Sequence, residues 1–159
     1  KLEFFVNEKT NHSEIFLNGE NVEYLIRDMV IAEKVSDVAA IKEVRTFAVL
    51  QQNKMGEKKG IVMDGRDIGT VVFPGAEIKF FMKADGAVRV ERRFKELFAK
   101  NPNITLDEIK HNIEMRDYLD SHREVSPLQK ADDAVEIDNT YLTEKEQFDL
   151  VLNLVMKKL

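Results

Sequence analysis

The sequence contains no cysteine, only three histidines and no long hydrophobic run. Without cysteine the chain can form neither a disulfide framework nor a thiolate metal site, a composition compatible with a reducing compartment. His12, His111 and His122 are not spaced with carboxylates as a metal cluster requires, so a histidine-ligated metal is not expected. No stretch reaches the ~18 apolar residues of a membrane span, and the N-terminus lacks a signal-peptide layout. We therefore expect a cytoplasmic protein with no membrane partner.

The charge balance argues against a nucleic-acid polymer as partner. The chain carries a net charge of −5 and a pI near 5.3, which gives no overall attraction to polyanions. Arginines that cluster locally can still hold a phosphate group. With 159 residues, 43% of them hydrophobic, the chain is long enough for one compact domain with small appended subdomains.

The stretch GIVMDGRDIGTVVFP at residues 60–74 joins a short apolar run to a polar turn. The apolar run at residues 61–63 predicts a buried strand. In open α/β sheets ligands bind outside the carboxyl ends of the strands, so Asp64, Arg66 and Asp67 are candidate binding residues. A solvated turn that carries a salt bridge is the alternative interpretation, and this short motif alone does not decide between them.

The remaining pattern predicts an α/β chain with a parallel sheet. Alternation over the first 26 residues predicts a small antiparallel β element with turns at Asn11 and at Asn18 with Gly19, and helical periodicity follows from Asp28 to about Lys54. Further along we expect a strand at 78–82 and a helix at 86–100. A polar helix to about Arg123 should start with a capping box of Thr105 and Glu108. We then expect a strand at 134–138 and a helix at 143–158, whose inward-facing residues should be Phe148, Val151, Leu152 and Val155.

Arginine and aspartate recur at helical spacing in the polar helix. Arg116, Asp120 and Arg123 fall at i, i+4 and i+7, so a continuous helix would place all three on one face. A surface ion pair with a spare arginine is the simpler interpretation. Such pairs contribute only ~0.2–0.5 kcal/mol, so stability gives little reason for the arrangement.

Three further arginines, Arg89, Arg92 and Arg93, fall within about one turn of the helix expected after residue 86. Alone they also fit a solvated helix face. Taken with the other arginines, they indicate a site for a polyanionic phosphate, because the planar guanidinium donates bidentate hydrogen bonds that lysine does not. Phosphoryl transfer needs mainly positioning and charge stabilisation, so such a site is chemically adequate for it.

The segments DGRDIGTVVFP, IKFF, VERR, MRDYLDSHR and SPL resemble the bacterial cytidylate kinase family in order and spacing across essentially the whole chain. The resemblance implies part of a P-loop kinase fold, a three-layer α/β structure with a parallel sheet. It implies a CMP-binding insert with antiparallel β structure at residues 1–59, core strands and a helix at 60–100, a helical lid at 101–126, and a last core strand and helix at 127–159. It also implies transfer of the ATP γ-phosphoryl group, with Mg²⁺, to CMP or dCMP.

The resemblance assigns four residues to recognition of the cytosine base. It implies that Ser36 and Asp67 accept hydrogen bonds from the amino group, and that Arg45 and Arg123 donate to N3 and O2. Ser36 and Arg45 lie nine residues apart, so at about 100° per residue one unbroken helix would turn them to opposite sides. We therefore expect a break in the helix between them, near residues 40–42.

The other implied roles concern phosphate and metal. By resemblance, Arg66 binds the CMP phosphate, and Arg116 and Asp120 are lid residues that reach the phosphate and the ribose hydroxyls. Asp64 orders Mg²⁺ through water, with no direct metal ligand in the chain. Asp64, Arg66 and Arg116 are thus the implied catalytic residues, and the implied ATP-binding residues are Arg89, Arg92 and Arg93.

One family feature has no counterpart in this sequence. The family pattern begins with a strand and a GxxxxGK[ST] loop, whereas the GEKKG at residues 56–60 lacks both the spacing and the following Lys-Ser/Thr. The chain resembles a family member without its first third, so we expect this polypeptide to be inactive or nearly so, and to self-associate, where the parent is an active monomer. A kinase for UMP or another monophosphate, and a non-enzymatic nucleotide-binding or interaction module, are the alternatives.

Overall fold

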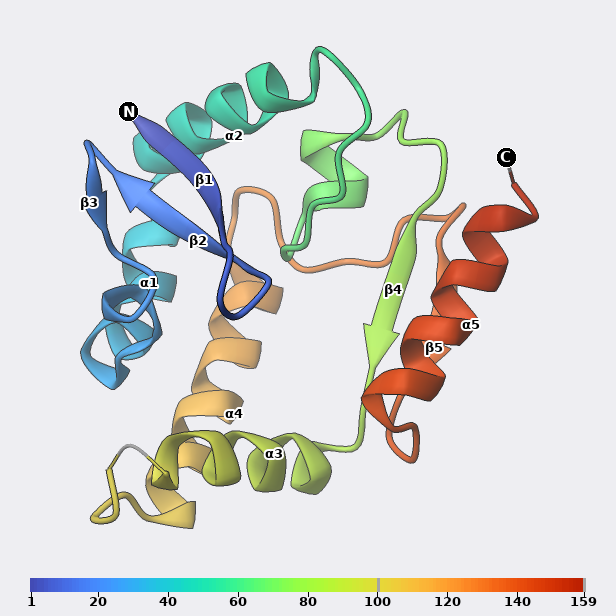
Figure 1. Ribbon diagram of the computed structural model, residues 1–159. Helices are drawn as coiled ribbons and strands as arrows, with labels where there is room; N and C mark the ends of the chain where they lie inside the picture. The colour runs from blue at the N-terminus through green and yellow to red at the C-terminus, as the bar shows by residue number, and fades with distance from the viewer. Residues whose placement is uncertain (100, 159) are drawn as a thin grey trace. The chain divides into compact units, whose positions relative to one another are not determined.

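The computed structural model describes residues 1–99 and 101–158 and divides the chain into two compact units, Lys1–Ala39 and Ala40–Leu159 (Figure 1). The first unit is built on a three-stranded antiparallel sheet in the order β1-β2-β3. Its elements are β1 (Leu2–Asn7), β2 (His12–Leu17), β3 (Glu20–Asn21), the short 3₁₀ helix η1 (Leu25–Arg27) and the helix α1 (Met29–Ala40).

The turns of the first unit fall where the sequence predicts them. Asn11 has a φ of 55°, and Asn18 and Gly19 have φ values of 52° and 88°. Asparagine and glycine tolerate this left-handed region better than other residues, which is why they mark the ends of the strands. The antiparallel element predicted for the first 26 residues is confirmed.

The helical segment is divided in two, also as predicted. The helix α1 ends at Ala40 and α2 (Lys42–Gly56) begins one residue after the extended Ile41, whose φ and ψ are −68° and 119°. No proline makes this break. The prediction that the helix is interrupted between Ser36 and Arg45 is therefore confirmed.

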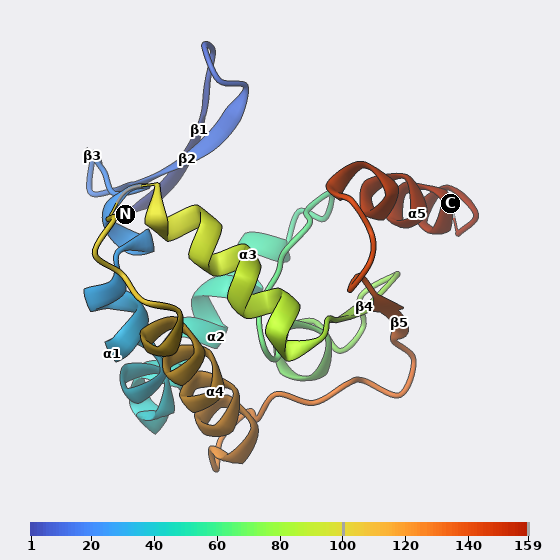
Figure 2. The same ribbon diagram turned by 90° about the horizontal axis from the view of Figure 1, so that it is seen from below.

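The second unit contains a parallel pair of strands with helices after each. The strands β4 (Phe80–Lys83) and β5 (Val135–Asp138) pair in parallel, with Phe80 opposite Val135. The helix α3 (Gly86–Phe98) leaves the end of β4, and α3 packs against α4 (Leu106–His122) (Figure 2). The unit also contains α2, the π-helical turn η2 (Ile68–Val72) and α5 (Glu144–Met156). The chain is thus a mixed α/β structure with parallel strand pairing, as expected.

The buried strand predicted at residues 61–63 is not present. The segment has no regular secondary structure, and the exposed fractions of Ile61 and Val62 are 42% and 103%. A strand needs a neighbour for its backbone hydrogen bonds. Of the described strands, β4 and β5 pair only with each other in their sheet, so the segment gains no strand partner and the side chains of Ile61 and Val62 remain exposed.

The predicted capping box starts α4, and a second one starts α5. Thr105 accepts a hydrogen bond from the Glu108 N–H and donates its own N–H to the Glu108 carboxylate at 2.8 Å. The same exchange links Thr143 and Glu146, at a spacing that the sequence also shows. These bonds satisfy backbone N–H groups that a helix start otherwise leaves without partners.

Removal of the first capping box gives a testable stability prediction. Thr105→Ala is expected to lower the free energy of unfolding by about 1 kcal/mol in urea titrations. The Thr105 N–H also lowers the pKa of Glu108, so the benefit of that bond is present above the ordinary glutamate pKa and is lost as pH falls through the lowered value. Ser13→Ala, which removes an exposed hydroxyl from β2, is the control and should leave unfolding unchanged.

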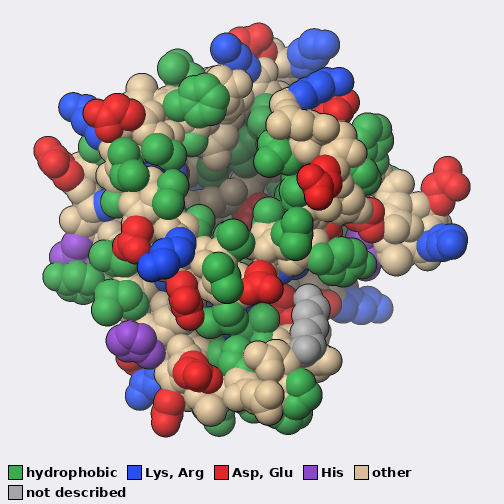
Figure 3. Space-filling view, turned by 90° about the vertical axis from the view of Figure 1, so that its left-hand side faces the viewer, with side chains coloured by type: hydrophobic (Ala, Val, Ile, Leu, Met, Phe, Trp, Pro, Cys, Tyr) green, Lys and Arg blue, Asp and Glu red, His purple; other side chains and the backbone are tan. Residues whose placement is uncertain are grey.

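The apolar core of the second unit is small. It contains the buried side chains of Val72, Leu97, Ile104, Ile109 and Ile137. The helix α5 has no buried residue, and Phe148 and Leu152 are 63% and 44% exposed, so the prediction that they face inward is wrong. Figure 3 shows hydrophobic side chains between charged ones over the face that it draws. Within the described residues no helix combines the length and apolar character needed to cross a membrane.

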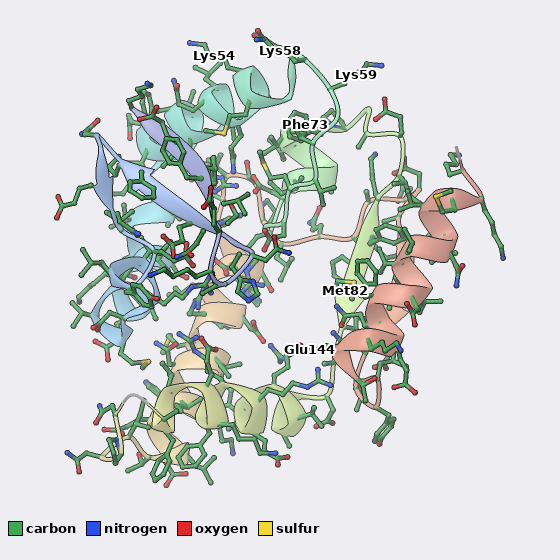
Figure 4. All side chains as sticks on the ribbon, viewed as in Figure 1. Lys54, Lys58, Lys59, Phe73, Met82 and Glu144 are labelled. Atoms are coloured by element: carbon green, nitrogen blue, oxygen red, sulfur yellow. The ribbon has the colours of Figure 1, made fainter. Side chains whose placement is uncertain are left out.

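A close contact between Gly56 and Phe73 holds the end of α2 against the chain segment that contains η2. In Figure 4, Phe73 lies below the end of α2, which carries Lys54, and below the turn that follows it, which carries Lys58 and Lys59. A Cβ atom at Gly56 would lie 2.3 Å from the Phe73 ring, so only glycine lets the helix end approach this closely. The contact holds the helix that carries Arg45 against the turn that follows Asp67.

Candidate functional site

A buried carboxylate lies at the centre of the site. Asp67 immediately precedes η2 and is 1% exposed, and its carbonyl accepts the Val71 N–H at 2.9 Å. Arg45, on α2, donates from Nε to Oδ2 of Asp67 at 3.1 Å and from Nη2 to Oδ1. The pair is therefore bidentate, an arrangement that fixes the guanidinium plane.

Arg123 lies beside this pair, one residue after the end of α4. Its side chain is only 4% exposed, and its Nη2 lies 4.0 Å from Oδ1 of Asp67. Nε donates to the Ser126 carbonyl at 2.6 Å, and Nη1 lies 3.5 Å from Oδ1 of Asp120. Nη2 is buried and has no hydrogen-bond partner among the described residues. Burial, and then the nearby Arg45, lower the pKa of Arg123.

A second buried carboxylate extends the site along α4. Asp120 has a side chain that is 5% exposed, and Arg66 donates to it from Nε at 2.9 Å. Arg116 is half-buried one turn earlier, and its Nε makes no hydrogen bond within the described part of the chain. Burial, and then repulsion from Arg66, lower the pKa of Arg116.

These side chains form one network, which we call the arginine cluster: Arg45, Arg66, Asp67, Arg116, Asp120 and Arg123. Four guanidiniums face two carboxylates, so the cluster has a surplus of positive charge although the whole chain is acidic. Buried N–H donors without a partner are costly unless a ligand satisfies them. The arrangement is therefore suited to a small anion with hydrogen-bond acceptors, such as a phosphate monoester.

Within the second unit, the structure brings together six of the predicted site residues. Ser36 is buried in α1 of the first unit, and its predicted role stays a prediction. Asp64 is exposed and forms no ion pair with a described residue. Arg89 pairs with Asp117 at 2.6 Å, and Arg93 pairs with Glu96 at 2.8 Å.

Arg92 makes contacts that its position in the sequence does not reveal. It donates to the carbonyls of Asn139, Thr140 and Leu142 at 2.8, 3.1 and 3.4 Å, and to the Asn139 side chain at 3.2 Å. Arg92 thus holds the loop after β5 in place. Backbone carbonyls accept from any donor, so no residue type at these positions could have indicated the contact.

Comparison with known proteins identifies the family of this chain. The cytidylate kinase family model matches residues 1–157. The cytidylate kinase of Flavobacterium psychrophilum is 53% identical over 155 residues, which are 98% of this chain and 69% of that protein. Those of Flavobacterium johnsoniae and Cytophaga hutchinsonii are each 54% identical, and the matches cover 98% and 99% of this chain and 67% and 68% of the two proteins. The chain therefore belongs to the cytidylate kinase family.

Proposed function

We propose that the arginine cluster binds cytidine monophosphate, and that in the whole protein this site serves transfer of the ATP γ-phosphoryl group to CMP or dCMP, giving CDP or dCDP. The observation that carries the proposal is the pair of buried carboxylates, each flanked by guanidiniums, with N–H donors of Arg116 and Arg123 left without partners. Family membership implies the P-loop kinase fold, to which the parallel α/β part belongs.

Asp67 would recognise the base. A carboxylate offers about four lone-pair sites, so Arg45 can keep its two bonds while Asp67 accepts from the cytosine amino group. The free Nη2 of Arg123 can donate to N3 or O2 of the ring. Uracil presents a carbonyl oxygen in place of the amino group, and two facing acceptors disfavour its binding. Arg45 completes the proposed base site within the second unit, and the hydrogen bond from the cytosine amino group to Ser36 stays a prediction from the family resemblance.

Arg66 and Arg116 would bind the phosphate. Both approach Asp120, which orients Arg66 through a 2.9 Å contact and lies within reach of ribose hydroxyls bound beside it. In this proposal residues 101–126 form the lid and residues 1–59 form the CMP-binding insert, while residues 60–100 and 127–159 belong to the core. Closure of such a lid would exclude water from the reacting phosphates.

ATP and Mg²⁺ would bind next to this site in the whole protein. Arg89, Arg92 and Arg93 of α3 remain the proposed ATP ligands, and Arg92 also anchors the loop after β5. Mg²⁺ in kinases is held by one or two carboxylates, waters and substrate phosphates. The exposed carboxylate of Asp64 would fit such a role through water. When bound, Mg²⁺ neutralises phosphate charge.

The 159-residue polypeptide is proposed to bind CMP without transferring phosphate when it is tested by itself. Its sequence contains no GxxxxGK[ST] loop, whose backbone amides and lysine hold the β- and γ-phosphates of ATP. Exposed apolar residues on α5 and at residues 61–62 favour self-association of this polypeptide. A monomeric parent enzyme in the cytoplasm stays part of the proposal.

Isothermal titration calorimetry with CMP, dCMP, UMP and ATP tests the proposed function. We expect CMP and dCMP to bind, UMP to bind at least about tenfold more weakly, and ATP to give no signal. Equal affinity for UMP and CMP would favour a kinase for another monophosphate. If none of the nucleotides binds, the chain is better described as an interaction module.

A further inference from the structure

A strained turn follows α4 directly beside the arginine cluster. Ser126 has a φ of 54°, and Pro127 comes next in the chain. Residues other than glycine rarely adopt this region, and a residue that precedes proline is normally extended. Strained backbone of this kind persists only where surrounding contacts hold it, and it is common at ligand sites.

The turn places one backbone carbonyl against Arg123. The carbonyl of Ser126 accepts the Arg123 Nε–H at 2.6 Å. Just beyond the turn, the Leu128 N–H donates to the Asp120 carbonyl at 2.7 Å, which ties the returning chain to the end of α4. The Ser126 hydroxyl makes no hydrogen bond to a described residue, so the backbone rather than the side chain of Ser126 provides the contact.

The contact with the Ser126 carbonyl determines which N–H group of Arg123 remains available to a ligand. With Nε held by Ser126 and Nη1 3.5 Å from Asp120, the remaining donor Nη2 lies 4.0 Å from Asp67 without a hydrogen bond. An arginine that is anchored at Nε loses less rotational freedom when it binds a ligand, because its plane is already fixed.

We propose that Ser126 is a positioning residue for substrate specificity, whose left-handed backbone directs its carbonyl to Nε of Arg123 and so holds Nη2 toward the nucleotide base beside Asp67. This inference rests on the proposed function. It concerns the alignment of Arg123, whereas the proposed function concerns only whether the cluster binds CMP.

Two substitutions separate the backbone role from the hydroxyl. Ser126→Gly keeps the carbonyl and suits a positive φ, so CMP affinity in calorimetry is expected to stay within about twofold of the unmodified chain. Ser126→Val places a β-branched residue where it is strongly disfavoured, so the turn changes and CMP affinity is expected to fall about tenfold. UMP affinity should change less, because uracil offers Arg123 only its O2 acceptor, whereas cytosine offers both N3 and O2. The ratio of the CMP affinity to the UMP affinity should therefore fall.

A double variant tests whether Ser126 acts through Arg123. Once Arg123→Ala has removed the guanidinium, adding Ser126→Val should weaken CMP binding no further. The proposal would be overturned if the losses of CMP affinity in the two single variants added fully in the double variant. It would also be overturned if the Ser126→Val chain folded and bound CMP and UMP with unchanged affinities. Either result would leave the proposed function intact. Failure of the unmodified chain to bind CMP would instead overturn the proposed function.

A measurement on the unmodified chain keeps the proposal testable if the valine variant does not fold. In ¹⁵N-resolved NMR spectra the Nε–H of Arg123 is expected to exchange with solvent at least about tenfold more slowly than that of Arg66, whose side chain is 42% exposed. Equal exchange rates would mean that the Ser126 carbonyl does not hold Arg123, and the proposal would fail.

Discussion

Replacement of Asp67 by asparagine is expected to abolish the preference for CMP over UMP. The amide can turn its NH₂ group toward the uracil carbonyl, whereas the carboxylate can only accept a hydrogen bond. The substitution also removes the charge that Arg45 and Arg123 face in a buried environment. Loss of one partner of a buried ion pair costs about 3–5 kcal/mol, so the free energy of unfolding in urea should fall by about this amount.

Asp149→Asn is the matched control for this prediction. Asp149 is exposed on α5 and forms no ion pair with a described residue, so the same chemical change there should alter neither stability nor nucleotide preference. Calorimetry with CMP and UMP on folded Asp67→Asn protein provides the decisive comparison. An unchanged ratio of the two affinities would remove Asp67 from base recognition.

Replacement of Arg116 by methionine is expected to stabilise the folded chain and to weaken CMP binding. Burial and the nearby Arg66 lower the pKa of Arg116, which means that folding is opposed by this charge at neutral pH. Methionine fills a similar volume without the charge, so the unfolding midpoint should rise. A charge-assisted hydrogen bond contributes about 1.5–3 kcal/mol, so CMP affinity should fall about 10- to 150-fold.

Two comparisons make the Arg116 prediction specific. Cytidine lacks the phosphate, so its affinity should be nearly the same for Arg116→Met and the unmodified chain. Lys110→Met, on the exposed side of the same helix, should leave both CMP binding and the unfolding midpoint unchanged. A loss of CMP affinity that cytidine shares in full would show that Arg116 does not act on the phosphate.

Local signals in the sequence predicted much of the fold. Asparagine and glycine marked the turns of the first sheet, and the capping box at Thr105 marked the start of α4, because each depends on residues close together in the chain. The break at Ile41 followed instead from the family resemblance, which assigns Ser36 and Arg45 to one base although a single helix would turn them to opposite sides. In contrast, residues 61–63 have the composition of a buried strand, and strand pairing depends on a neighbour that local sequence does not specify.

The candidate site was predicted only in part. The residue types and their resemblance to the family identified the arginines and aspartates, but not the pairing of Arg45 with Asp67 or of Arg66 with Asp120 across 22 and 54 positions. Contacts to backbone carbonyls, such as Arg92 with the loop after β5 and Arg123 with Ser126, leave no side-chain pattern. A positive φ at a serine before proline is likewise opposed by local preference, so only tertiary structure reveals it.

A crystal structure of this chain with CMP tests the central claim most directly. The account predicts that the CMP phosphate lies within hydrogen-bond distance of Arg66 and Arg116, with the cytosine amino group on Asp67 and Nη2 of Arg123 at the ring edge. Binding of CMP at a different surface, with the arginine cluster still paired as described and making no contact to the nucleotide, would contradict it.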